Sequence, residues 1–292
     1  MRSHRDPERP GGSADRPQAE DTQRDAGRRP GRLVVVSIGP GHEDYMAPAA
    51  REALVVAEVV FGYKVYLDLI SELVQGKQLV SSGMRKEIER CNAAIDSALA
   101  GREVALVSSG DAGIYGMAGL VYDLCRQRGL RLTGREASSD ADADLSVEVL
   151  PGIPAFNAAA SLVGAPLMHD FAVVSLSDHL TPWEVIAKRL GAAAEADFVL
   201  AIYNPRSKSR PHLLAKACNI LMRSRSPETP VAIVRRAMRE EQWVHLATLG
   251  AIPMEEVDMQ SVVIVGNSRT YVWEGRMVTP RGYLEKYDVT ES

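Results

Sequence analysis

The chain has 292 residues, of which 46% are hydrophobic and 25% are charged, the composition of a globular protein with a large core. Its formal net charge of −4 argues against a dedicated nucleic-acid-binding protein, because such proteins usually carry a broad basic surface. No apolar run approaches the ~20 residues of a membrane span, and the N-terminus lacks the apolar core of a signal peptide. We therefore expect a cytoplasmic protein that contacts neither nucleic acid nor membrane.

The three cysteines, Cys91, Cys125 and Cys218, lie far apart in the chain and form no CxxC pair. No histidine accompanies them at the spacing of a metal site. This pattern predicts reduced, buried thiols, with no disulfide framework and no metal site.

Residues 1–31 form a separate compositional zone, with many prolines, glycines and mixed charges. Such a segment cannot bury enough apolar surface to offset its ordering entropy, so it predicts a disordered tail. From Leu33 onward, short apolar runs alternate with amphipathic stretches, which predicts a largely parallel sheet covered by helices on both faces. The expected strands are the run beginning at Leu33 and residues 59–63, 103–111 and 147–156, with helices near 48–58, 86–100 and after Met117.

A second α/β set follows a helix of small residues that starts after about Phe156. Its expected strands are 172–177, 198–204, 230–236 and 261–267, with connecting helices near 182–190 and 211–224. The sequence thus predicts an α/β fold of two consecutive domains, residues 32–155 and 156–283, followed by a tail at 284–292.

Three glycine turns follow expected strands of the first domain, at Gly39-Pro40-Gly41, at Gly110–Gly116 and at Pro151–Pro154. Ligands of open α/β sheets collect at the carboxyl ends of strands. One such glycine is usually only a turn, but three in one domain indicate that the backbone approaches a ligand closely.

The first turn does not fit a nucleotide-phosphate site. The dinucleotide fingerprint GxGxxG needs a third glycine where Asp44 stands, and Pro40 lacks the N–H that a pyrophosphate would use. A Walker motif GxxxxGK[ST] is also missing from the chain. We therefore expect a ligand without a phosphate, which weakens the hypothesis of a nicotinamide oxidoreductase.

The strings IGPGHEDYMAP, VALVSSGDAGIYGMAGLVYDL and LPGIPAFNAAASLVGAPL resemble the tetrapyrrole methylase family, and the similarity runs from about Leu33 to Tyr283. The resemblance implies two unlike α/β domains around an active-site cleft, each with a largely parallel or mixed sheet flanked by helices. It also implies S-adenosylmethionine as the methyl donor, an anionic tetrapyrrole as substrate, and a homodimer.

Four further segments are similar to the family members that methylate precorrin-3B at C-17 and contract the ring, a step of cobalamin biosynthesis. They are GYKVYLDLI (62–70), SGMRKEIERC (82–91), HDFAVVSLSDHLTPWEVI (169–186) and AIYNPRSKSR (201–210). The expected activity is therefore this C-17 methylation, with the cobalt-containing substrate of the anaerobic route as the alternative.

The motif matches also imply which residues bind the donor and the substrate. Donor contact is expected at Gly110, Asp111, Ala112, Ile114, Tyr115, Gly116, Pro154 and Ala155, and more loosely at Asn204, Ala232, Ser261 and Val262. The loop Gly39-Pro40-Gly41 is expected to face the tetrapyrrole. Because precorrins carry many carboxylates, Arg206, Lys208 and Arg210 are expected to bind substrate, whereas Arg235, Arg236 and Arg239 stay open between that role and simple solvation.

Ring contraction benefits from a general acid–base pair, and the polar candidates are His42, Asp111, Ser177 and Asp178. Each has a structural alternative. For His42 an exposed loop histidine is the favoured interpretation. Asp111 is equally consistent with an aspartate that stabilises its own turn, and at Asp178 a helix N-cap competes with the favoured polar contact to substrate.

Other functions remain open within and beyond this fold. Relatives of the same architecture methylate RNA or a diphthamide precursor, and an RNA enzyme should show a wider basic face. A non-catalytic binding module is the alternative from a different class, and the intact glycine turns argue against it.

Overall fold

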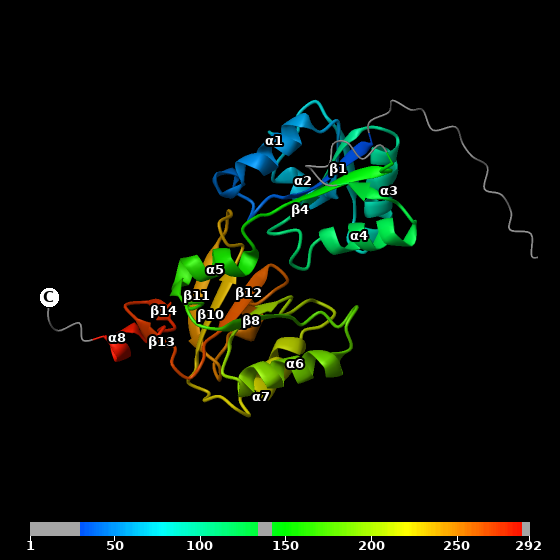
Figure 1. Ribbon diagram of the computed structural model, residues 1–292. Helices are drawn as coiled ribbons and strands as arrows, with labels where there is room; N and C mark the ends of the chain where they lie inside the picture. Colours follow the sequence, from blue (N-terminus) through cyan, green and yellow to red (C-terminus); the bar gives the residue numbers. More distant parts are fainter. Residues whose placement is uncertain (1–29, 134–141, 288–292) are drawn as a thin grey trace, which may run out of the picture.

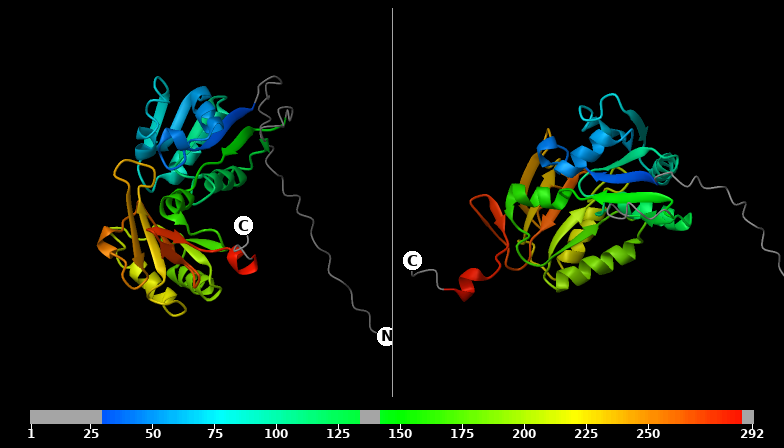
Figure 2. Two further views of the ribbon diagram at one scale, coloured as in Figure 1. Left: turned by 90° about the vertical axis from the view of Figure 1, so that its left-hand side faces the viewer. Right: turned by 45° about the horizontal axis from the view of Figure 1, so that its top comes forward.

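The computed structural model describes residues 30–133 and 142–287, which form two α/β units in chain order (Figure 1). The tail expected at 1–31 lies outside the described residues except for its last two positions, and Gly31 already begins the first strand. Figure 2 shows from two further sides that helix α5 (Ala155–Val163) lies at the border between the two units.

The N-terminal unit contains a six-stranded sheet in the order β3-β2-β4-β1-β6-β5, in which every pairing is parallel. Helices cover both faces because the strands are apolar at successive positions: Leu33 packs toward α3 and α4, and Val34 packs toward α1. The strands are β1 (Gly31–Ser37), β2 (Val59–Tyr63), β3 (Gln78–Ser82), β4 (Glu103–Ser108), β5 (Leu132–Thr133) and β6 (Leu145–Leu150). The helices are α1 (Pro48–Val56), α2 (Lys64–Asp68), α3 (Glu87–Leu99) and α4 (Ala118–Gln127).

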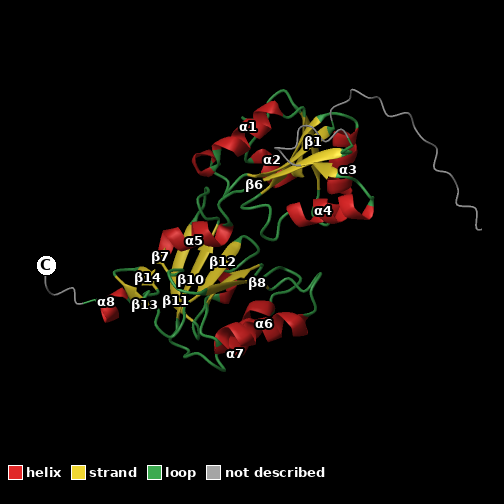
Figure 3. Ribbon diagram, in the orientation of Figure 1, coloured by secondary structure: helices red, strands yellow, loops and turns green. Residues whose placement is uncertain are grey.

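The C-terminal unit contains a five-stranded sheet in the order β11-β10-β12-β9-β8, and this sheet is mixed, since only β8 and β9 pair in parallel. Helix α5 covers one face of this sheet, and α6 and α7 cover the other (Figure 3). Ile233 packs with residues of α6 and α7, whereas its neighbours Ala232 and Val234 pack with residues of α5. The strands are β8 (Phe171–Ser175), β9 (Val199–Tyr203), β10 (Pro230–Arg235), β11 (Trp243–Thr248) and β12 (Ser261–Val265), and the helices are α6 (Trp183–Glu195) and α7 (Leu213–Leu221).

Smaller elements complete the described chain. A three-stranded sheet consists of β7 (Gly164–Ala165), β13 (Tyr271–Trp273) and β14 (Arg276–Val278). Two short 3-10 helices are η1 (Glu43–Tyr45) and η2 (Met254–Glu256). Helix α8 (Tyr283–Lys286) occupies the start of the tail expected at 284–292, and residues 288–292 lie outside the described residues. The longest helices of the described segments, α3 and α6, have 13 residues each, too short and too polar to cross a bilayer.

The predicted α/β class is confirmed, and most expected elements lie close to their predicted bounds. The differences have local causes. The strand expected to run to residue 111 ends at Ser108 because Gly110 has a φ of +68°. The strand expected to reach 156 ends at Leu150 because Pro151 follows it and has no N–H to donate to the sheet, and Pro154 then caps α5. Strands β3 and β11 were not expected because their residues alternate poorly and lie at sheet edges.

Candidate functional site

The three glycine turns lie at one edge of the N-terminal sheet. They follow β1, β4 and β6, which are parallel neighbours, so their carboxyl ends point the same way. The Gly39 N–H donates to the Gly110 carbonyl at 3.1 Å, and the Gly110 N–H donates back to the Gly39 carbonyl at 2.7 Å. Both glycines have φ near +65°, a region that side chains disfavour, so the first two turns pair through their backbones.

Asp111 ties the second turn to the third. One carboxylate oxygen accepts from the Gly113 N–H at 2.8 Å and the other from the Gly152 N–H at 3.0 Å. A Cβ added at Gly152 would lie 2.4 Å from the Gly110 carbonyl oxygen, so this contact requires glycine. The turn-stabilising alternative for Asp111 therefore has a geometric basis, because both of its oxygens are engaged by loop N–H groups.

Two tyrosines join this edge to the C-terminal unit. The Tyr115 hydroxyl donates to the Val173 carbonyl of β8 at 3.2 Å, and its ring lies 5.3 Å from the ring of Tyr203. The Tyr203 hydroxyl in turn accepts from the Phe156 N–H at the start of α5, at 3.0 Å. Burial raises the pKa of both phenols, so they remain neutral hydrogen-bonding groups at physiological pH.

Arg239 makes a second link between the units, from the loop that connects β10 and β11. Its Nε donates to the Pro40 carbonyl, and its Nη2 donates to the Ser109 hydroxyl at 2.8 Å. Burial lowers the pKa of the guanidinium, which nevertheless stays protonated at neutral pH. Sequence reasoning left this residue open, because its partner Pro40 lies 199 positions away.

The polar residues predicted after β8 form a network with the Asn204 turn. The Asn204 side chain donates to the Ser175 hydroxyl at 2.9 Å, and Asn204 has a φ of +51°. Arg210 donates from Nη1 to the Ser177 hydroxyl and to the Asp178 carboxylate, each at 3.0 Å. The hydrogen bond from Arg210 lowers the pKa of Asp178, so this carboxylate is ionised at neutral pH and is a weaker base than an unpaired aspartate.

The predicted substrate cations differ in how they are engaged. Arg206 donates to the Met254 carbonyl at 3.0 Å and to the Glu255 carboxylate at 2.6 Å, which ties it to η2. Lys208 is exposed and borders a hollow of about 490 Å³ that Asp258 also lines. Arg206 and Arg210 are thus both paired with acidic side chains of the chain itself.

The remaining predicted donor residues of the C-terminal unit lie in its core. The Ala232 side chain is fully buried and packs with Val262 beneath α5. The Ser261 hydroxyl donates to the Asp258 carboxylate at 3.0 Å. The side chains at these three predicted positions, Ala232, Ser261 and Val262, are therefore already packed or hydrogen-bonded within the protein.

His42 lies apart from the other acid–base candidates. Its Nδ1 accepts from the Asp44 N–H at 3.3 Å as the cap of η1, and its side chain is 56% exposed. Among the described residues, no hydrogen bond joins it to Ser177 or Asp178, which belong to the other unit. The exposed-loop alternative for His42 fits this geometry.

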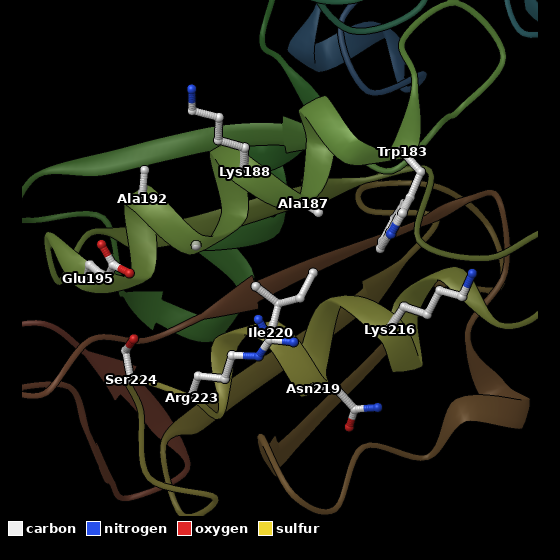
Figure 4. A pocket seen from close by; sticks show the side chains of 11 residues that line it. Trp183, Ala187, Lys188, Ala192, Glu195, Lys216, Asn219, Ile220, Arg223 and Ser224 are labelled. Carbon is white, nitrogen blue, oxygen red and sulfur yellow. The ribbon is translucent and has the colours of Figure 1, made fainter.

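A hollow of about 720 Å³ lies elsewhere, between α6 and α7 (Figure 4). Lys216 lies 5.6 Å from the ring of Trp183 at one end of it. Its lining residues come from neither the glycine turns nor the Asn204 loop. In the described segments, no group of histidine, cysteine or acidic residues could hold a metal ion.

Comparison with known proteins agrees with the expected family. The family model described as Tetrapyrrole (Corrin/Porphyrin) Methylases matches residues 32–253. A probable cobalt-factor III C(17)-methyltransferase of Salmonella typhimurium is 53% identical over 251 residues, which cover 86% of this chain and 99% of that protein.

Solved structures show the same similarity. The crystal structure of the methyltransferase CobJ matches with a TM-score of 0.77 and 36% identity, covering 86% of this chain and all of that one. A uroporphyrin-III C-methyl transferase from Thermus thermophilus, complexed with S-adenyl homocysteine, shares the fold at a TM-score of 0.58 and 22% identity, over 81% of this chain and 97% of that one. The protein is thus a methyltransferase, and the chain belongs to the tetrapyrrole (corrin/porphyrin) methylase family.

Proposed function

We propose that this chain uses S-adenosylmethionine to methylate C-17 of a tetrapyrrole intermediate in cobalamin biosynthesis. The observation that carries the proposal is the 53% identity to a probable cobalt-factor III C(17)-methyltransferase over nearly the whole of that protein. That name makes cobalt-factor III the first substrate to test. The sequence motifs resemble enzymes that act on metal-free precorrin-3B with ring contraction, and they do not separate it from the cobalt-containing substrate, so the proposal includes both forms.

The glycine turns fit a donor that is held mainly by main-chain groups. A Cβ added at Gly110 would be in ordinary van der Waals contact with the backbone of Pro154 and Ala155, at 3.6–3.7 Å, so the second turn lies beside the start of α5. We assign donor contact to the segment Gly110–Gly116 and to Pro154-Ala155. Tyr115 is 56% exposed, and its ring provides an apolar surface suited to an adenine.

Bound S-adenosylmethionine supplies a methyl group that is already activated by a sulfonium. The task of the protein is therefore placement, which can contribute on the order of 7–11 kcal/mol to lowering the barrier. Asp111 serves this as a positioning residue, because it holds the second turn against the third. Asp178, with Ser177 beside it, and His42 are our candidates for proton transfer during ring contraction.

A homodimer, expected from the family resemblance, is also part of the proposal. Exposed apolar side chains gather at the C-terminal end, on β13 and around α8: Tyr271, Val272, Trp273, Tyr283, Leu284 and Tyr287. Trp273 is 61% exposed and Leu284 79% exposed, which is unusual for side chains of this kind in a monomer. Light scattering on the purified chain should give twice the chain mass of 31.8 kDa.

The test of the proposed function is an incubation of the purified protein with methyl-labelled donor and, separately, cobalt-factor III, precorrin-3B and ribosomal RNA. We expect label in a tetrapyrrole, one added methyl group by mass, and no label in RNA. The absorption spectrum of the product then reports whether the ring has contracted. Label in RNA alone, or in none of the three, would overturn the proposal.

A further inference from the structure

Arg239 reaches from the C-terminal unit into the first glycine turn of the N-terminal unit. Its two hydrogen bonds, to the Pro40 carbonyl and to the Ser109 hydroxyl, place the guanidinium directly before Gly110. The loop that delivers it has an unusual backbone, with positive φ at Arg236, Met238 and Glu241. Each such residue costs free energy, and conformations of this kind cluster where a loop is shaped for function.

The first turn leaves room for this side chain. A Cβ added at Gly41 would lie 2.6 Å from the Arg239 Nε and 3.2 Å from its Cζ, so a larger residue at position 41 would force the guanidinium to move. Gly41 also has a φ of +126°, which side chains rarely adopt. Pro40 presents a carbonyl and has no N–H, so the turn that cannot bind a pyrophosphate is well suited to a cation.

The charge of Arg239 has no acidic partner in the described part of the chain. Both of its hydrogen-bond acceptors are neutral oxygens, whereas Arg206, Arg210 and Arg236 are each paired with a carboxylate. A guanidinium has five N–H donors, and these contacts use two of them. A partly buried cation without a counter-ion is costly, so the site is incomplete until an anion arrives.

We propose that Arg239 binds a peripheral carboxylate of the tetrapyrrole substrate, with Gly41 providing the space for its guanidinium. The inference rests on the proposed function and deepens it. Guanidinium forks pair with carboxylates through two parallel hydrogen bonds, and the acidic side chains of a precorrin offer several such groups. The donor carries a carboxylate too, so the experiment must separate these two sources.

The test compares Arg239→Met with the control Arg236→Met. Arg236 lies three residues earlier in the same loop, carries the same charge and is already paired with Glu241. We expect Arg239→Met to raise the KM for the tetrapyrrole by about 10- to 100-fold, while the calorimetric Kd for S-adenosylhomocysteine changes by less than about twofold. Arg236→Met should change neither. Arg239→Lys should recover only part of the loss, because lysine keeps the charge but not the fork.

A second variant leaves Arg239 in place. Gly41→Ala should displace the guanidinium and reproduce the increase in KM. The salt dependence of the KM for the tetrapyrrole separates a binding role of Arg239 from a structural one. The wild-type KM should rise with ionic strength more steeply than the KM of Arg239→Met.

The outcomes distinguish this inference from the proposed function. If the wild type methylates a tetrapyrrole and Arg239→Met has the same KM as Arg236→Met, the assignment of Arg239 fails alone. If Arg239→Met weakens only S-adenosylhomocysteine, the carboxylate belongs to the donor and the assignment again fails. A wild type that methylates no tetrapyrrole overturns the proposed function and this inference together.

Discussion

The glycine-turn edge of the N-terminal unit and the Arg206–Arg210 loop of the C-terminal unit are built in different ways. At the edge, backbone groups bond to one another, as between Gly39 and Gly110, and one carboxylate joins two turns. In the loop, long side chains bond to acidic partners, as between Arg210 and Asp178. The edge is therefore sensitive to backbone geometry, and the loop is sensitive to charge.

The difference follows from the two sheets. In the parallel sheet, the carboxyl ends of β1, β4 and β6 share one edge, so successive motifs in the sequence converge. In the mixed sheet, β9 and β12 run in opposite directions, so their carboxyl ends lie at opposite edges. A motif after a strand is consequently a better guide to a shared site in the first unit than in the second.

The largest expected effect is at Gly152, where the three turns are packed most tightly. In Gly152→Ala, the new Cβ would meet the Gly110 carbonyl at 2.4 Å, so we expect a loss of at least about 1–3 kcal/mol in the free energy of unfolding and a loss of donor affinity. Gly119→Ala is the matched control, since its Cβ meets nothing within 4 Å and alanine favours helix α4 by up to about 1 kcal/mol. Equal stability of the two variants in urea would contradict the backbone-built edge.

Substitution of Asp111 tests whether its carboxylate joins the second and third glycine turns. Asp111→Asn leaves one of the Gly113 and Gly152 N–H groups without an acceptor, so we expect a loss of about 1–3 kcal/mol in the free energy of unfolding without any ligand. Donor affinity, measured by calorimetry with S-adenosylhomocysteine, should fall as well. Replacing Gly110 and Asp111 together should abolish donor binding.

If Asp111→Asn kept the wild-type stability but lost donor affinity, the Asp111 carboxylate would bind the donor directly and would not join the two turns. Asp123→Asn is the control, because that aspartate is exposed and makes only a surface pair with Arg126.

Arg206 and Lys208 sharpen the comparison within the charged loop. Arg206→Met removes the bonds to η2 and should lower the free energy of unfolding by about 1–3 kcal/mol. Lys208→Met should change stability by less than about 0.5 kcal/mol, because the side chain is exposed, and should raise the tetrapyrrole KM if it binds substrate. Denaturant titrations and steady-state kinetics on both variants decide which of the two residues acts on substrate.

The smallest expected effect is a pH-dependent one at Asp178. Its pKa is lowered in the folded state by Arg210, so the pair stabilises the fold above the ordinary aspartate pKa of 3.8 and loses this contribution as the pH falls through the folded value. Asp178→Asn should therefore be less stable than wild type at pH 7 by under about 1 kcal/mol, a difference that shrinks below pH 3.8. Thermal unfolding across that range measures it, and a difference that grows on acidification would contradict the pairing.

Much of the fold followed from local patterns in the chain. Runs such as Leu33–Val36 are apolar at every position, which identifies strands buried on both faces, and the expected family is confirmed by the comparisons. The donor and substrate residues remain predictions. The edge strands β3 and β11 were missed because half-exposed strands carry a weak pattern.

The residues themselves dictated which segments become strands and that three of them end in glycine turns, because backbone conformation and burial depend on neighbours within a few positions. Folding alone decided which charges are neutralised. Arg206 meets Glu255 across 49 residues because β9 and β12 are neighbours in the C-terminal sheet, and Arg239 meets Pro40 across 199 because the two units pack together. Neither encounter follows from a spacing in the chain. That is why the cation cluster expected to bind substrate is largely paired internally, while a single arginine from another loop reaches the glycine turns with its charge unpaired in the described residues.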